Sequence, residues 1–156
     1  MGLDDDIDKL AGIPAFAGME LEALRVMAFS ADRLALRAGD VLFRRDEVSD
    51  AGFAVLSGSV AVDASGHGAT ARIVRPPALI GERALLIETR HPAAAIAREP
   101  TVALKIPRQL FHRVLSEFPQ SAERLRQALS RDLRQFVGAL AAVRKGLMPE
   151  DEAPGE

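Results

Sequence analysis

The chain has 156 residues, of which 48% are hydrophobic and 27% are charged, enough for one sizeable hydrophobic core and short for two independent ones. It contains no cysteine, which excludes disulfides, thiolate nucleophiles and metal sites ligated by cysteine. The formal net charge is −2, but acidic residues gather at both ends, so that residues 9–149 hold 20 basic and 14 acidic side chains. We therefore expect one mildly basic domain between an acidic N-terminal tail (1–9) and an acidic, disordered C-terminal tail (147–156).

The sequence carries no sign of export or of membrane insertion. Its N-terminus lacks the basic start and the apolar run of a signal peptide, and no stretch reaches the roughly 18 apolar residues of a membrane helix. We expect a soluble cytoplasmic protein with no membrane partner. The aromatic residues are seven Phe, without Trp or Tyr, which argues against a base-stacking surface for single-stranded nucleic acid.

The first two thirds of the chain change from a helical to a β pattern. Apolar spacing over residues 7–30 predicts short helices joined by a turn, the better one at about 19–29. From there to residue 106, short runs rich in β-branched and aromatic residues are separated by turn-forming residues. The expected strands lie at 33–36, 41–44, 53–56, 59–62, 70–74, 93–97 and 102–106. This spacing predicts an α+β protein built on an antiparallel β-roll or jelly roll at about 33–106, not a parallel sheet.

The last third returns to a helical pattern, with a short helix at about 108–116 and a long one at about 119–146. Pro119 suits the first turn of the long helix, and Gly146 suits its end. Apolar residues three and four positions apart form a seam typical of a parallel dimer helix. The seam residues are Leu133, Phe136, Leu140, Val143 and Leu147. The alternative is that this face packs on the chain's own β-roll.

Two segments carry a family resemblance. The first is LFRRDEVSDAGFAVLSGSVAV at 42–62, and the second is PPALIGERALLIETRHPAAAIA at 76–97. They resemble the β-roll signature and the phosphate-binding cassette of the cyclic-nucleotide-binding domain family. The resemblance is closest to the sensor domains of cyclic AMP receptor protein type regulators, without their helix-turn-helix domain. It implies a double-stranded β-helix with N-terminal helices and a long C-terminal helix, in a domain at 10–146.

The cassette residues explain how such a segment binds phosphate. Gly81 leaves room for a close backbone approach, and a short helix beginning near Glu82 points free N–H groups at an anion. The resemblance implies that Glu82 accepts a hydrogen bond from a ribose 2′-hydroxyl and that the backbone at Ala84 holds the cyclic phosphate, together with Ala93 and Ala94. The expected ligand-binding residues are Gly81, Glu82, Arg83, Ala84, Leu85, Arg90, His91, Ala93 and Ala94. Without the motif, Glu82 is more simply a solvated carboxylate at a helix N-terminus.

The second half of the cassette departs from the family pattern. In an ungapped alignment the family's phosphate-pairing Arg falls on His91, and the Pro before it becomes Arg90. A one-residue slip would let Arg90 supply the guanidinium, whereas His91 would be a weaker, pH-dependent substitute. Pro92 removes one backbone N–H, and the family's Gly-Asp before the hairpin is Asp46 and Glu47 here. These changes predict nucleotide binding weakened by more than about tenfold.

We expect a dimeric stand-alone sensor that binds cyclic AMP or cyclic GMP and relays binding through its C-terminal helix to a protein partner. Cyclic di-GMP is an alternative ligand, for which Arg83 and Arg90 would contact the second phosphate. No motif indicates an enzyme, and the three histidines lack metal-ligand spacing, so neither catalysis nor a metal is expected. Only nine residues follow Leu147, which is too few for a DNA-reading domain. We therefore expect either a stand-alone sensor or a truncated form of a longer regulator. The alternative is a degenerate fold that binds no nucleotide and serves as a dimerising protein-interaction module.

Overall fold

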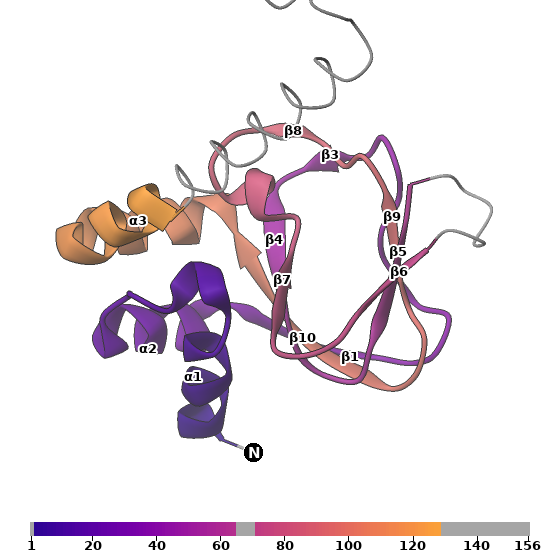
Figure 1. Ribbon diagram of the computed structural model, residues 1–156, viewed down its shortest axis with the longest axis horizontal. Coiled ribbons are helices and arrows are strands. Elements are labelled where there is room, and N and C mark those ends of the chain that lie inside the picture. The colour runs from indigo at the N-terminus through magenta and orange to yellow at the C-terminus, as the bar shows by residue number, and fades with distance from the viewer. Residues whose placement is uncertain (1, 65–70, 129–156) are drawn as a thin grey trace, which may run out of the picture.

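The computed structural model describes residues 2–64 and 71–128. Within them, helices gather on one side of a β-roll, beside β4 and β10, while β5, β6 and β9 form its far wall (Figure 1). The expected dimer seam of Leu133, Phe136, Leu140 and Val143 lies outside the described residues, as does the acidic segment 147–156.

Antiparallel strands of mixed chain order build the roll. They are β1 (Asp32–Leu36), β2 (Val41–Phe43), β3 (Val48–Ser49), β4 (Ala51–Ser57), β5 (Val60–Asp63), β6 (Arg72–Val74), β7 (Ala78–Ile80), β8 (Thr89–Arg90), β9 (Ala94–Ala97) and β10 (Thr101–Pro107). Two four-stranded sheets have the orders β1-β10-β4-β7 and β2-β9-β5-β6, and β3 pairs with β8. Paired strands that are distant in sequence are typical of a jelly roll. The predicted α+β fold class is therefore confirmed.

The interior of the roll is a small apolar core. It contains Phe43, Phe53, Val55, Val60, Val74, Ile80 and Ala95. The rings of Phe43 and Phe53 lie 5.6 Å apart in a tilted arrangement. Gly58 turns the chain from β4 into β5 with a φ of 87°, and a Cβ there would lie 2.5 Å from the carbonyl oxygen of Pro100. Only glycine fits this turn without a rearrangement.

A second core lies between the helices and the outer face of the β1-β10-β4-β7 sheet. The helices are α1 (Leu3–Ala11), η1 (Pro14–Phe16), α2 (Leu21–Ser30) and α3 (Arg108–Glu117), and η1 is a 3-10 turn. Their largest buried side chains are Leu10, Ile13, Phe16, Leu24, Met27, Phe111 and Val114. The core also includes Leu104 and Ile106 of β10, so this sheet is buried on both faces.

The N-terminal segment differs from the expected tail, because residues 3–9 belong to α1. Ile7 and Leu10 lie on one helical face and are buried in the second core. Asp6 is buried as well, and its carboxylate accepts a hydrogen bond from the guanidinium of Arg33 on β1. The other acids of the first turn suit the positive end of the helix dipole. The acidic composition concealed an amphipathic helix.

The helical part that follows α3 begins as expected, and residues 119–128 are helical. Leu125 is buried in the second core, and the hydroxyl of Ser121 accepts a hydrogen bond from the backbone N–H of Glu20 at 2.8 Å. This segment is therefore anchored to the N-terminal helices. Among the described residues, no helix has the length and apolar character needed to cross a bilayer.

Candidate ligand-binding site

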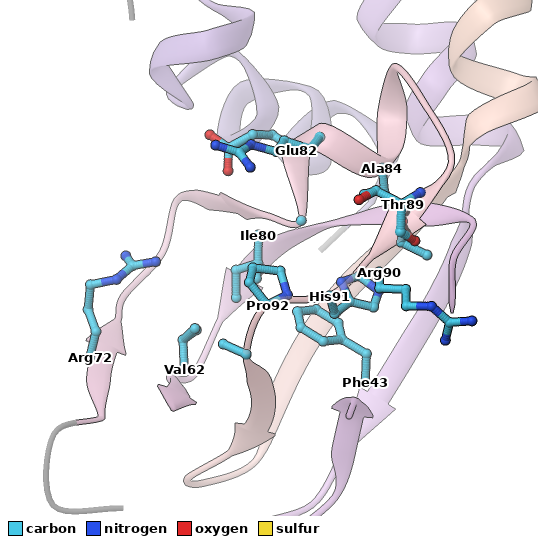
Figure 2. Close-up of a pocket in the computed structure, with 14 residues that line it drawn as sticks. Phe43, Val62, Arg72, Ile80, Glu82, Ala84, Thr89, Arg90, His91 and Pro92 are labelled. Atoms are coloured by element: carbon cyan, nitrogen blue, oxygen red, sulfur yellow. Dashed lines mark hydrogen bonds between the residues drawn. The ribbon is translucent and has the colours of Figure 1, made fainter. Parts of the chain in front are cut away.

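A cavity of about 210 Å³ opens between the turn η2 (Glu82–Leu85) and the inner faces of the roll. Figure 2 shows its walls, with Glu82 and Ala84 on one side, Arg72 and Val62 on another, and His91 and Phe43 at the base. Seven of the nine expected ligand-binding residues line it, namely Gly81, Glu82, Arg83, Ala84, Arg90, His91 and Ala93. Leu85 and Ala94 are not among its lining residues. The structure thus brings most of the predicted cassette to one hollow.

The first half of the cassette has a backbone shaped for anion binding. Gly81 has a φ of 75°, a left-handed conformation that favours glycine, and it turns the chain from β7 into η2. The N–H of Ala84 donates to the carbonyl oxygen of Gly81 at 3.0 Å, which closes the 3-10 turn. The first N–H groups of such a turn have no acceptor within it. An anion bound at this turn would supply such an acceptor.

Leu85 anchors this turn to the sheet below it. The side chain is buried in the helical core and lies over Gly52 of β4, where an added Cβ would be 2.9 Å from its Cγ. Glycine at position 52 therefore leaves the space that Leu85 fills. An apolar side chain at the end of η2 gains more from the core than from the polar cavity, and the contact of Leu85 with a ligand stays a prediction.

Strand alternation separates the two candidate cations of the second half. Arg90 pairs with Val48 across β3 and β8, and its side chain points away from the cavity (Figure 2). Its Nη1 donates to the carbonyl oxygen of Asp46 at 2.7 Å. His91 follows it and points inward, because successive residues of an extended chain face opposite sides. The slip that would place the Arg90 guanidinium in the site does not occur in this structure.

His91 is held as part of the cavity base. It is 5% exposed, and its ring stacks on Phe43 with centroids 3.7 Å apart and planes 10° apart. Its backbone N–H donates to the carbonyl oxygen of Glu47 at 2.9 Å, and its own carbonyl accepts from the N–H of Asp46 at 2.8 Å. Burial lowers the pKa of His91 below its usual value, and the carboxylates of Glu47 and Asp50 oppose this shift without cancelling it. The ring is therefore neutral at pH 7.

Arg72 lines the cavity from β6, and sequence reasoning did not single it out as a charged contact. In Figure 2 its guanidinium is directed toward the cassette, whereas that of Arg90 points away. The signal was present in the strand pattern: Val74 is buried inside the roll, so the residue two positions earlier shares its face. Ser49 and Thr89 also line the cavity and were not singled out.

The chemistry of the cavity suits a ligand with an anionic group and a hydroxyl group. Its ionisable side chains are one carboxylate, Glu82, the arginines 72 and 83 and the neutral imidazole of His91, whereas the guanidinium of Arg90 points away. Backbone N–H groups and guanidinium groups both favour a phosphate, and a carboxylate accepts from a hydroxyl. Within the described residues no three His, Asp or Glu side chains gather as a metal site.

Comparison with known proteins agrees with this geometry. Residues 33–118 match the family model described as the cyclic nucleotide-binding domain. A cyclic nucleotide-binding-like protein from Brucella abortus bv. 1 str. 9-941 is 36% identical, with a TM-score of 0.65, and the match covers 72% of this chain and 99% of that one.

Two regulators are similar as well. The N-terminal domain of a transcriptional regulator from Streptomyces coelicolor A3(2) is 26% identical, with a TM-score of 0.76 and coverage of 85% of this chain and 95% of that one. The catabolite activator protein of Thermus thermophilus is 27% identical, with a TM-score of 0.70 and coverage of 83% and 62%. The jelly roll, the cassette and these matches agree, and the chain belongs to the cyclic nucleotide-binding domain family.

Proposed function

We propose that the chain is a regulatory sensor domain, not an enzyme, that binds a cyclic nucleotide, cyclic AMP or cyclic GMP, in the cavity beside η2. The observation that carries this proposal is the left-handed Gly81 followed by the η2 turn at the cavity wall, which presents backbone N–H groups to an anion. Family membership supports the same ligand class. No metal is part of the proposal.

Each wall of the cavity has a role in this proposal. Glu82 accepts a hydrogen bond from the ribose 2′-hydroxyl, and the backbone of residues 81–84 holds the cyclic phosphate with help from Ala93 and Ala94. Arg72 and Arg83 supply positive charge, since both line the cavity. A neutral, stacked His91 adds no charge, so we expect weaker binding than in a site with an inward-facing arginine.

The signal is relayed through the helical residues after α3. Their anchoring at Ser121 and Leu125 places them against η1, η2 and the N-terminal helices. In this proposal a change at the cassette repositions the C-terminal helix. That helix forms a homodimer through Leu133, Phe136, Leu140 and Val143. It contacts a protein partner in the cytoplasm and does not bind DNA directly.

Calorimetric titration with cyclic AMP, cyclic GMP and cyclic di-GMP tests the binding step. We expect heat and a thermal shift with at least one of them, and an affinity at least about tenfold lower for Glu82→Gln. Glu88→Gln is the matched control, because Glu88 lies in the same segment but does not line the cavity. The absence of heat and of a thermal shift at millimolar ligand would contradict nucleotide sensing.

A second candidate function is supported by the cavity base. His91 occupies the place of the family's arginine as a buried, neutral ring packed on Phe43, which favours a fold that has lost its ligand. In that case the chain is a dimerising protein-interaction module. Loss of assembly in Phe136→Asp, with no nucleotide response in the unaltered chain, is the result that this alternative expects.

A further inference from the structure

Arg108, the first residue of α3, joins two neighbouring segments of the cavity lining from outside the cavity. Its Nε donates to the carbonyl oxygen of Ala84 in η2 at 3.0 Å, and its Nη2 donates to the carbonyl oxygen of Ser49 in β3 at 2.6 Å. Ala84 and Ser49 both line the cavity, whereas Arg108 is not among its lining residues. One guanidinium therefore ties η2 and β3 to the start of a helix.

Further hydrogen bonds extend this connection to a third cavity residue. The hydroxyl of Ser49 donates to the carbonyl oxygen of Thr89 at 2.7 Å and accepts from its N–H at 3.2 Å. The backbone N–H of Arg108 donates to the carbonyl oxygen of Asp50 at 2.9 Å. Backbone and side chain of Arg108 thus both bond to the β3 region.

The chemistry of this contact is specific to a guanidinium. The rigid, planar fork reaches two acceptors in different segments at once, whereas an ammonium group is a single point of donation. In the described part of the chain Arg108 takes part in none of the ion pairs, so its donors serve these backbone carbonyls. Helix α3 itself packs on η2 and is followed by the helical residues 119–128 (Figure 1).

We infer that Arg108 is a positioning residue that couples occupancy of the cavity to the position of α3. The inference rests on the proposed function, since it requires a ligand at the cassette. A phosphate that binds the backbone of residues 81–84 shifts the carbonyl oxygen of Ala84, and the guanidinium transmits this shift to the first turn of α3. Helix α3 then reads the state of the cavity directly, in addition to the helix that follows it.

Hydrogen–deuterium exchange of the full chain tests the coupling, with and without the tightest-binding of the three cyclic nucleotides at saturation. In the unaltered protein the ligand slows exchange in η2 and changes it in α3. In Arg108→Gln the response of η2 stays and the response of α3 falls at least threefold. Arg108→Lys gives an intermediate response, and Arg113→Gln, an exposed arginine of the same helix, behaves like the unaltered protein.

The outcomes separate the inference from the proposed function. If Arg108→Gln binds ligand and α3 responds as in the unaltered protein, the inference is overturned and the proposed function stands. If the unaltered protein binds none of the nucleotides, both are overturned. A merely structural Arg108 lowers stability with and without ligand but leaves the α3 response intact. Should Arg108→Gln fail to fold, Arg108→Lys decides: a reduced α3 response supports the coupling, and a full response overturns it.

Discussion

The two halves of the cassette use different means to shape one cavity. In the first half, the left-handed Gly81 and the turn η2 set the course of the backbone along the cavity wall. In the second half, β8 and the residues after it place one side chain inward and its neighbour outward. A backbone site depends on conformation and tolerates side-chain changes around it. A side-chain site changes its charge with one substitution or one position of register.

The same distinction explains why the departures from the family pattern differ in consequence. Asp46 stands where the family has glycine, yet it adopts a φ of 70°, a left-handed conformation that Asp tolerates better than most residues. The turn is therefore kept. At His91 the substitution replaces a charge with a neutral ring that packs on Phe43. At position 91 the backbone conformation is therefore retained, whereas the positive charge of the side chain is lost.

The largest expected effect comes from disturbing the first half with Gly81→Ala. A left-handed non-glycine residue costs about 1–2 kcal/mol, and the shifted turn lowers nucleotide affinity by more than about tenfold. Gly39→Ala is the matched control, because Gly39 also has a positive φ, with open space around it and a position outside the cavity. Chemical denaturation should give similar stability losses for both, and calorimetry should give weaker binding for Gly81→Ala alone. Equal nucleotide affinities of the two variants would contradict a role of the Gly81 backbone in ligand binding.

The variant His91→Arg tests the second half of the cassette, because it places a guanidinium at the inward-facing position. We expect nucleotide affinity to rise about tenfold, equivalent to about 1.4 kcal/mol, while loss of the ring stacking lowers stability by about 1 kcal/mol. His112→Arg adds the same charge on the exposed face of α3 and should leave affinity unchanged. If both variants bind like the unaltered protein, the missing charge at position 91 is not what limits affinity.

A smaller effect concerns the pH dependence of stability. The folded protein holds the pKa of His91 below its usual value, so between the two pKa values the unfolded chain binds more protons. The stability due to the neutral ring is fully present above about pH 6.5 and is lost as the pH falls through the lowered folded pKa. Urea denaturation from pH 7.5 to 5 should show this decline.

His91→Gln should flatten the decline, whereas His112→Gln should keep it. An unchanged slope in His91→Gln would show that other groups cause the pH dependence.

The smallest effect is expected for Arg90→Ala. Its guanidinium is exposed and bonded to the carbonyl oxygen of Asp46, so nucleotide affinity should stay within about twofold. Arg72→Ala removes the same charge from the cavity wall and should weaken binding about fivefold, or about 1 kcal/mol. The reverse order in a titration would mean that Arg90 turns inward when ligand binds.

Much of the fold followed from sequence pattern because the longer strands and helices carry their own periodicity. The expected helices at 19–29 and 108–116 correspond to α2 and α3 within a residue or two. The strands β3, β7 and β8 were missed, because strands of two or three residues have too little pattern and depend on their pairing partners. Residues 1–9 were misread because composition outweighed the spacing of Leu3, Ile7 and Leu10.

The candidate site divides in the same way. The family resemblance of the segment 76–97 located the cassette, with Gly81 and Glu82 in its motif. Sequence reasoning did not single out Arg72, which reaches the cavity through the closure of the roll, or Arg108, whose two acceptors lie 24 and 59 positions away in the chain. Contacts between residues so far apart in the chain depend on how the strands are arranged in space, which a local sequence pattern does not indicate.

By itself, then, the sequence predicted the jelly roll, because turns and alternation are local properties. Its resemblance to a known family indicated the location of the cassette and the ligand class to be tested. Only the tertiary structure decided that Arg90 faces outward while His91 packs on Phe43, because the pairing of β3 with β8 sets which side of the chain faces the cavity. The same closure of the roll brought Arg72 to the cavity and Arg108 behind its wall.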